Sequence, residues 1–242
     1  MTLYSPEQMK ENIAKVREQI ADAAKEAGRD PSEITLIGVS KFFPAEYAAQ
    51  AFSLGLTDLG ENRAEEMHEK KQVLDEKDLH PKWHLIGTLQ SRKVRLIAGE
   101  PYLIHSVDSM SLAKEISKRY VTIETRAKIL LEVNVSGEES KHGFSAAEAV
   151  EEIETLLALP NLDICGLMTM APIQNAPGEA KTVFEKARRL FEELKRRGVD
   201  ENCWKYLSMG MSGDFREAIS CGATHVRIGT AIFGKRDYPD PV

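Results

Sequence analysis

The sequence predicts an α/β protein in which all 242 residues form a single (βα)8 barrel, also called a TIM barrel. Short apolar runs rich in β-branched residues alternate eight times with helix-like stretches, which is typical of a parallel sheet. The first run lacks the glycine-rich turn of a dinucleotide-binding fold, so a closed barrel is favoured over an open doubly wound sheet. No Gly/Ser-rich or Pro-rich linker divides the chain, and we expect one domain over residues 1–242.

The first expected element is a long helix that begins at the Ser5-Pro6 cap and ends near Gly28. The next element is a strand, an apolar run between two prolines that ends on Lys41. The eight expected strands are residues 34–41, 57–62, 83–87, 102–107, 127–136, 163–170, 205–210 and 225–229. The helices expected between them are residues 44–55, 63–74, 91–99, 110–120, 145–159, 178–198 and 212–222, and several of them end at glycine.

The charge pattern argues against nucleic acid as a partner. The formal net charge is −6, and the sequence has no long basic run of the kind that phosphate-backbone binding requires. The basic clusters at 186–189 and 195–198 alternate with acidic residues, which indicates a solvated helix face.

The cysteines and the N-terminus predict a cytoplasmic protein. Three cysteines form no CxxC pair and leave an odd thiol, which fits a reducing compartment. The first residues do not resemble a secretory signal, and no apolar run reaches the roughly 18 residues of a membrane span. The histidines and cysteines show no metal-ligand spacing, so no metal is expected.

Lys41 is the first candidate site residue, because active sites of barrels lie at the C-terminal ends of the strands. An amine partly desolvated at that position is nucleophilic and suits Schiff-base chemistry. The alternative is a lysine that only extends its ammonium group from the barrel mouth into solvent.

The last strand ends in a candidate phosphate site. Gly229 permits close backbone approach, and Thr230 adds a hydroxyl at the start of a short helix. The turn of Met211, Ser212 and Gly213 offers a second set of donors, with Ser212 also expected as the N-cap of the following helix. Simple helix capping is the alternative reading of both turns.

Three further residues at strand ends are candidates for contact with a bound ring. Arg227 is expected either to face a ring nitrogen or to form an ion pair at the barrel rim. Asn62 and His84 can hydrogen-bond or stack on a ring, or can satisfy the loop backbone and pack beside Trp83.

The motifs along the chain closely resemble those of the pyridoxal phosphate homeostasis protein family. They are VSKFFP, DLGEN, WHLIGTLQSRK, SVDS, VNVSGEESKHGF, GLMTM, SMGMSGDFREAI and VRIGTAIFG. The resemblance runs in order from about residue 34 to Tyr238, and Arg63 and Arg92 depart from it at the rim. It implies a barrel of the alanine racemase N-terminal-domain type that holds pyridoxal 5′-phosphate (PLP) as a Schiff base on Lys41.

The same resemblance implies roles for the other candidates. Arg227 faces the pyridine nitrogen, and Asn62 lies near the ring. The phosphate is held by Ser212, Gly229 and Thr230. Independently of the resemblance, Lys141 and His142 lie in the polar loop after the fifth strand, where they are expected to form a lid or a second aldehyde-reactive position. The alternative is an ordinary solvated loop lysine.

The function implied is PLP binding in intracellular PLP (vitamin B6) homeostasis, with supply to apo-enzymes as transient partners and effects on amino-acid metabolism, rather than enzymatic turnover. An amino-acid racemase is the first alternative, with a tyrosine of this chain or of a partner subunit as the second acid/base; Tyr206 and Tyr238 flank elements of the site. A class I aldolase, with Lys41 attacking a sugar-phosphate carbonyl, is the second. The outer helices lack a self-complementary apolar stripe, so a monomer is expected.

Overall fold

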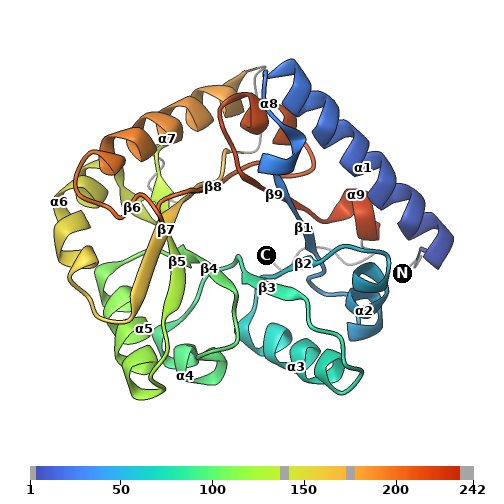
Figure 1. Cartoon of the computed structure of the whole chain (residues 1–242), viewed down its shortest axis with the longest axis horizontal. Coiled ribbons are helices and arrows are strands. Elements are labelled where there is room, and N and C mark those ends of the chain that lie inside the picture. Colours follow the sequence, from blue (N-terminus) through green and yellow to red (C-terminus); the bar gives the residue numbers. More distant parts are fainter. Residues whose placement is uncertain (1–3, 137–141, 173–177, 235–242) are drawn as a thin grey trace.

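A computed structural model describes residues 4–136, 142–172 and 178–234 and confirms the expected barrel. Eight parallel strands close on themselves in the order β1, β2, β3, β4, β5, β7, β8, β9, with β9 paired to β1 and β5 to β4 (Figure 1). They are β1 (Thr35–Val39), β2 (Asp58–Glu61), β3 (Lys82–Leu85), β4 (Leu103–Val107), β5 (Ala127–Asn134), β7 (Leu162–Met168), β8 (Tyr206–Ser208) and β9 (His225–Ile228).

Helices surround this ring, as Figure 1 shows. They are α1 (Pro6–Glu26), α2 (Ala45–Ser53), α3 (Ala64–Asp75), α4 (Val94–Ile97), α5 (Met110–Thr122), α6 (Ala146–Leu157), α7 (Glu179–Lys195), α8 (Phe215–Ser220) and α9 (Thr230–Phe233), with short 3-10 turns η1 (Pro31–Glu33) and η2 (Ser91–Lys93). The leading helix α1 begins at the predicted Ser5 cap and packs against α8 and α9. In the described residues no helix is long and apolar enough to cross a membrane.

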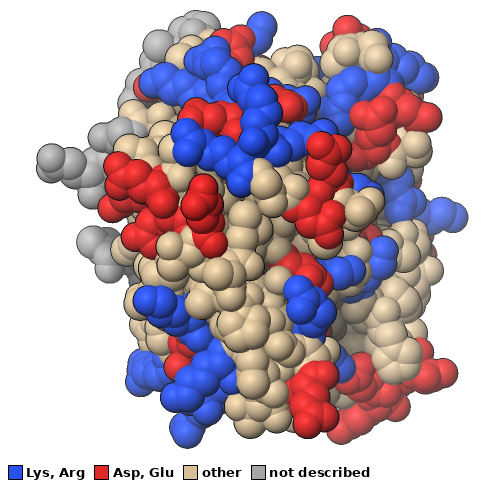
Figure 2. All heavy atoms as spheres, turned by 60° about the vertical axis from the view of Figure 1, so that its left-hand side comes forward, with Lys and Arg blue, Asp and Glu red and all other residues tan. Residues whose placement is uncertain are grey.

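Helix α7 shows why these segments become the outer layer. Its buried residues recur every three or four positions, which places one apolar stripe against the strands. Its basic residues at 186, 188 and 189 are exposed, as the charge alternation predicts. Figure 2 shows basic and acidic side chains interspersed over the outer face on this side of the barrel.

Two elements differ from expectation. The strand β6 (Phe144–Ser145), too short to leave a periodic signal, pairs with the end of β5 through Val133 and Phe144. Ser145 also caps α6, because its hydroxyl accepts from the Glu148 N–H and the Glu148 carboxylate accepts from the Ser145 N–H. The helix expected over 91–99 is instead the turn η2 followed by the four residues of α4.

Candidate functional site

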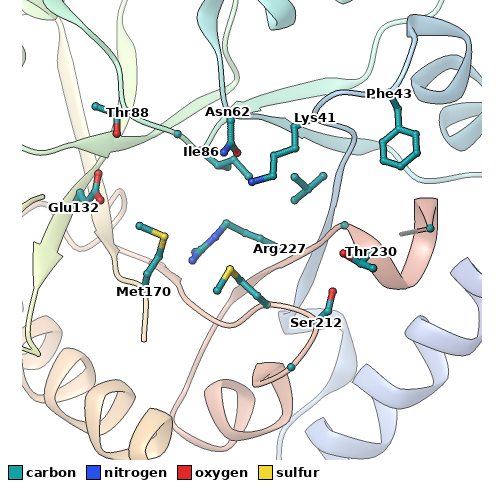
Figure 3. A pocket seen from close by; sticks show the side chains of 16 residues that line it. Lys41, Phe43, Asn62, Ile86, Thr88, Glu132, Met170, Ser212, Arg227 and Thr230 are labelled. Carbon is teal, nitrogen blue, oxygen red and sulfur yellow. The ribbon is translucent and has the colours of Figure 1, made fainter. Parts of the chain in front are cut away.

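A cavity of about 430 Å³ opens at the C-terminal ends of the strands, within the roughly 300–1,000 Å³ typical of small-molecule sites. Its lining includes six of the seven predicted site residues: Lys41, Asn62, Ser212, Arg227, Gly229 and Thr230. The pairing of β1 with β9 places Ile37 opposite Arg227, which explains how the two ends of the chain meet at one site. Figure 3 shows the Lys41 side chain extending into this cavity in the direction of Arg227.

Helix α3 holds the backbone on both sides of Lys41. Lys70 Nζ donates to the Ser40 carbonyl at 2.7 Å, and the Phe42 N–H donates to Glu66 Oε1 at 2.5 Å. Phe42 has a φ of 68°, a left-handed conformation that is uncommon for a bulky residue. The hydrogen bond that Phe42 N–H donates to Glu66 therefore stabilises the turn that presents Lys41.

A buried charge cluster lies beneath that turn. Lys70 is 4% exposed and lies 2.6 Å from Glu61 Oε1 and 2.8 Å from Glu66 Oε1, while the Ser40 hydroxyl donates to Glu61 at 2.6 Å. Burial raises the pKa of Glu61 to about 7 despite the adjacent Lys70 ammonium. Sequence reasoning missed this cluster, because Glu66 and Lys70 form an i,i+4 pair that is usually a surface feature.

Arg227 reaches the cavity from β9 with only 5% of its surface exposed. Its Nη1 donates to the Ser208 hydroxyl at 2.7 Å and its Nη2 to the Thr169 carbonyl at 3.1 Å, so these bonds go to neutral groups instead of an ion-pair partner. Burial lowers the pKa of Arg227 to about 10, which still leaves the guanidinium charged at neutral pH. Figure 3 shows the guanidinium pointing toward the centre of the cavity.

Two turns line the other side of the cavity, where the hydroxyls of Ser212 and Thr230 lie near each other (Figure 3). The expectation that Ser212 caps α8 is wrong, because the N-cap residue is Asp214, whose carboxylate accepts from the Met211 N–H at 2.6 Å. Gly229 precedes α9 as predicted, and a Cβ there would approach the Val39 carbonyl to 3.3 Å. The Ser212 and Thr230 hydroxyls therefore line the cavity where an anion could bind, next to the backbone at Gly229.

His84 does not reach the cavity, contrary to expectation. It is fully buried, with Nε2 3.0 Å from Asp58 Oδ1 and Nδ1 2.9 Å from His105 Nε2. Side chains two residues apart on a strand share a face, and Ile86 lines the cavity on the same side. His84 therefore lies one layer deeper in the barrel than Ile86. The expectation that it contacts a ring bound in the cavity is wrong.

The structure also adds residues to the site. Glu132 on β5 is 5% exposed, and burial, with the nearby Asp108 carboxylate, raises its pKa to about 7. A single acidic residue inside the mostly apolar run 127–136 was the available signal in the sequence. His142 is exposed outside the cavity, and Lys141 lies outside the described residues. No group of three or more potential metal ligands occurs within the part of the chain that the structure describes.

Asn62 lines the cavity beside Lys41, and its position depends on close packing with the next loop. A Cβ on Gly87 would lie 2.4 Å from the Asn62 carbonyl oxygen and 2.7 Å from its Cα. Only glycine fits at position 87 without moving Asn62.

Comparisons with known proteins agree with this geometry. The family model described as "Alanine racemase, N-terminal domain" matches residues 5–237. The chain is 43% identical over 229 residues to the pyridoxal phosphate homeostasis protein of Aquifex aeolicus, covering 94% of this chain and 98% of the relative. It is 38% identical over 231 residues to the protein of the same name from Escherichia coli K12, covering 94% and 96%.

Solved structures with a similar fold include a PLP-binding protein and an alanine racemase. PipY of Synechococcus elongatus, determined with PLP bound, superposes with a TM-score of 0.81 at 32% identity, covering 93% of this chain and 100% of PipY. An alanine racemase of Clostridium difficile superposes with a TM-score of 0.73 at 17% identity, covering 97% of this chain and 58% of the racemase. The second likeness shows the fold alone.

Proposed function

The chain belongs to the alanine racemase N-terminal domain family and, within it, to the pyridoxal phosphate homeostasis proteins, and from this premise we propose that it binds PLP and acts in intracellular PLP homeostasis. One observation supports the proposal most directly. Lys41 extends into a cavity that also presents a buried guanidinium and two hydroxyl-bearing turns. An amine, a ring partner and a phosphate cradle are the three groups that PLP needs.

The residues present fit the cofactor. PLP supplies an aldehyde that forms a Schiff base with a lysine amine. We assign that amine to Lys41 and the phosphate contacts to Ser212, Gly229 and Thr230. Asn62 is assigned to the ring beside Lys41.

Arg227 is assigned to the pyridine nitrogen, where it favours sequestration over catalysis. A guanidinium that stays charged at neutral pH can only donate, so it keeps the ring nitrogen unprotonated. An unprotonated ring withdraws electrons weakly and activates bound amino acids poorly. The relatives' name, a homeostasis protein, agrees with binding without turnover.

We further propose that the chain passes PLP to apo-enzymes in transient complexes. The cavity rim supports this, because Met170 and Met211 line the cavity while remaining 41% and 40% exposed. Flexible methionine side chains suit contact with several partners. A single PLP-binding domain over residues 1–242 and a cytoplasmic location complete the proposal, the latter supported by three cysteines that are all free thiols.

Absorbance titration of the purified protein with PLP tests the proposed function. We expect wild type to develop the visible band of a PLP–lysine Schiff base, and Lys41→Ala to lose it. Lys205→Ala is the matched control, because Lys205 precedes β8 at the opposite end of the barrel. A wild-type protein that takes up no PLP would refute the cofactor assignment and favour the aldolase alternative.

Addition of L- or D-alanine to the loaded protein tests the absence of turnover. We expect no racemisation and no exchange of the α-proton with solvent. Racemisation that disappears in Lys41→Ala would make the protein an amino-acid racemase.

A further inference from the structure

A chain of hydrogen-bonded polar side chains crosses the barrel interior, where barrels usually hold apolar residues. It runs from Asp58 through His84, His105 and Ser208 to Arg227, on strands β2, β3, β4, β8 and β9. The four distances along it are 3.0, 2.9, 2.9 and 2.7 Å. His84, His105 and Ser208 are completely buried, and Asp58 and Arg227 are 8% and 5% exposed.

The two ends of the chain fix the direction of every hydrogen bond in it. Arg227 can only donate, so the Ser208 oxygen accepts from Nη1 and does not direct its own proton at the guanidinium. A neutral His105 with its proton on Nε2 then accepts the Ser208 proton at Nδ1. At the other end the Asp58 carboxylate accepts from His84 Nε2–H. A neutral His84 then accepts at Nδ1 from His105 Nε2–H, so each of the four hydrogen bonds has one donor and one acceptor.

Burial keeps both imidazoles in the neutral form that this pattern needs. It lowers the pKa of His84 in spite of the Asp58 hydrogen bond, and it lowers the pKa of His105 well below its usual value. Burial alone would raise the pKa of Asp58, but the hydrogen bonds from His84 and Thr57 outweigh it and leave that pKa below its ordinary value. His225, whose ring lies 6.1 Å from each of the other two, is also buried and has a pKa lowered to about 3.

We propose that Asp58, His84, His105 and Ser208 are positioning residues for Arg227, which orient its guanidinium toward the cavity through this one-directional chain. If Ser208 turned its proton toward Arg227, two donors would face each other and the guanidinium would have to rotate. Asp58 is separated from Arg227 by the side chains of His84, His105 and Ser208. Through them it fixes which N–H groups of the Arg227 guanidinium remain for a ligand. The effect on PLP rests on the proposed function, whereas the direction of the chain does not.

Nitrogen NMR of the apo-protein tests that direction without any cofactor. Resonances of 15N-labelled histidine distinguish protonated from bare ring nitrogens, and spectra of His84→Gln and His105→Gln assign them. We expect both imidazoles to be neutral at pH 7, with protons on Nε2 and bare Nδ1 atoms. A proton on Nδ1 of either ring, or a charged imidazole, would overturn the proposal.

Variants of the chain test the effect on the bound ring. We expect Ser208→Ala and His105→Phe to shift the visible band of bound PLP and to weaken PLP binding about fivefold or more, because each leaves a buried donor or acceptor unpaired. His225→Phe is the matched control, since His225 lies among the same rings but bonds to Thr224 outside the chain. A band and an affinity in Ser208→Ala and His105→Phe equal to those of His225→Phe would contradict the proposal.

Two substitutions of similar size at Asp58 test whether the end of the chain farthest from Arg227 affects the bound ring. Asp58→Asn keeps a carbonyl acceptor for His84, and we expect its PLP band to match wild type. Asp58→Leu removes the acceptor, and we expect the band to shift. Equal spectra for the two variants would refute a role for Asp58.

The two proposals can fail separately. If wild type binds PLP on Lys41 while the chain variants behave like His225→Phe, the positioning role is lost and the proposed function stands. If wild type binds no PLP, the proposed function is lost, and the histidine spectra alone decide the direction of the chain.

Discussion

Glu132 is a buried acid on the wall of the cavity, and its ionisation is coupled to folding. Its pKa is raised to about 7, whereas an unfolded glutamate titrates near about 4.3. Between these values the folded state binds more protons, so this residue lowers stability as pH rises through that range. The penalty is complete above about pH 7 and absent below about pH 4.

We therefore predict that Glu132→Gln stabilises the apo-protein at high pH. The gain in unfolding free energy should be on the order of 2 kcal/mol at pH 8 and should shrink toward zero near pH 5. Urea unfolding at several pH values measures it, with the exposed Glu154→Gln as control. A gain that does not depend on pH would show that Glu132 is ionised without penalty.

Lys70 pairs with the buried carboxylate of Glu61, so its removal should destabilise the fold. Lys70→Met should lower the unfolding free energy on the order of 3 kcal/mol at pH 8, because Glu61 is left charged and buried without its partner. The loss should be smaller at pH 6, where Glu61, with a pKa of about 7, accepts a proton. The neighbouring Lys71→Met removes a surface pair with Asp75 and should cost far less. Similar losses in the two variants would mean that burial of Lys70 is unimportant.

Some site residues were predictable from sequence and others were not, for identifiable reasons. Lys41 follows β1 by two residues and Arg227 lies next to the last residue of β9; both apolar runs are plain in the sequence, so their place near the barrel mouth follows from the fold. His84 was misplaced by one layer, because a strand buried on both faces does not show which residue is nearest the mouth. The buried Lys70 cluster depends on how α3 packs on the turn after β1, which no local pattern encodes.

At the scale of elements, α3 connects the fold to the site by fixing the turn that bears Lys41. We predict that Glu66→Ala weakens PLP binding about fivefold, because the Phe42 N–H loses its acceptor and the left-handed turn relaxes. Glu65→Ala is the matched control, since Glu65 pairs with Lys93 at the helix surface. The comparison is an absorbance titration with PLP, and equal affinities for the two variants would exclude the proposed role of α3.

The order of elements was predictable because eight apolar runs alternate with helical segments that have clear caps and glycine stops. The two-residue strand β6 and the four-residue helix α4 were not, since they are too short to show a helical or strand period in the sequence. The residues that line the cavity lie outside β6 and α4, so six of the seven predicted residues come together in spite of these two differences.

Closure of the barrel is the property of the whole molecule that creates the site. Lys41 and Arg227 lie far apart in the sequence, near the first and the last strand of the barrel, and meet because β1 pairs with β9. The outer helices carry mixed charges on the face that Figure 2 shows, which gives a second copy no uniform surface to bind. We predict a monomer, and sedimentation should give the 27.0 kDa of one chain at micromolar concentration. A stable mass of twice that value would contradict this prediction.

Locating the bound PLP on the chain tests directly whether Lys41 is the residue that holds it. The protein is incubated with PLP, reduced with borohydride, digested and analysed by mass spectrometry. We predict one modified peptide, with the reduced PLP group on Lys41. Modification of another lysine, or modification spread over many lysines with Lys41 unlabelled, would contradict the assignment of Lys41 as the residue that holds PLP.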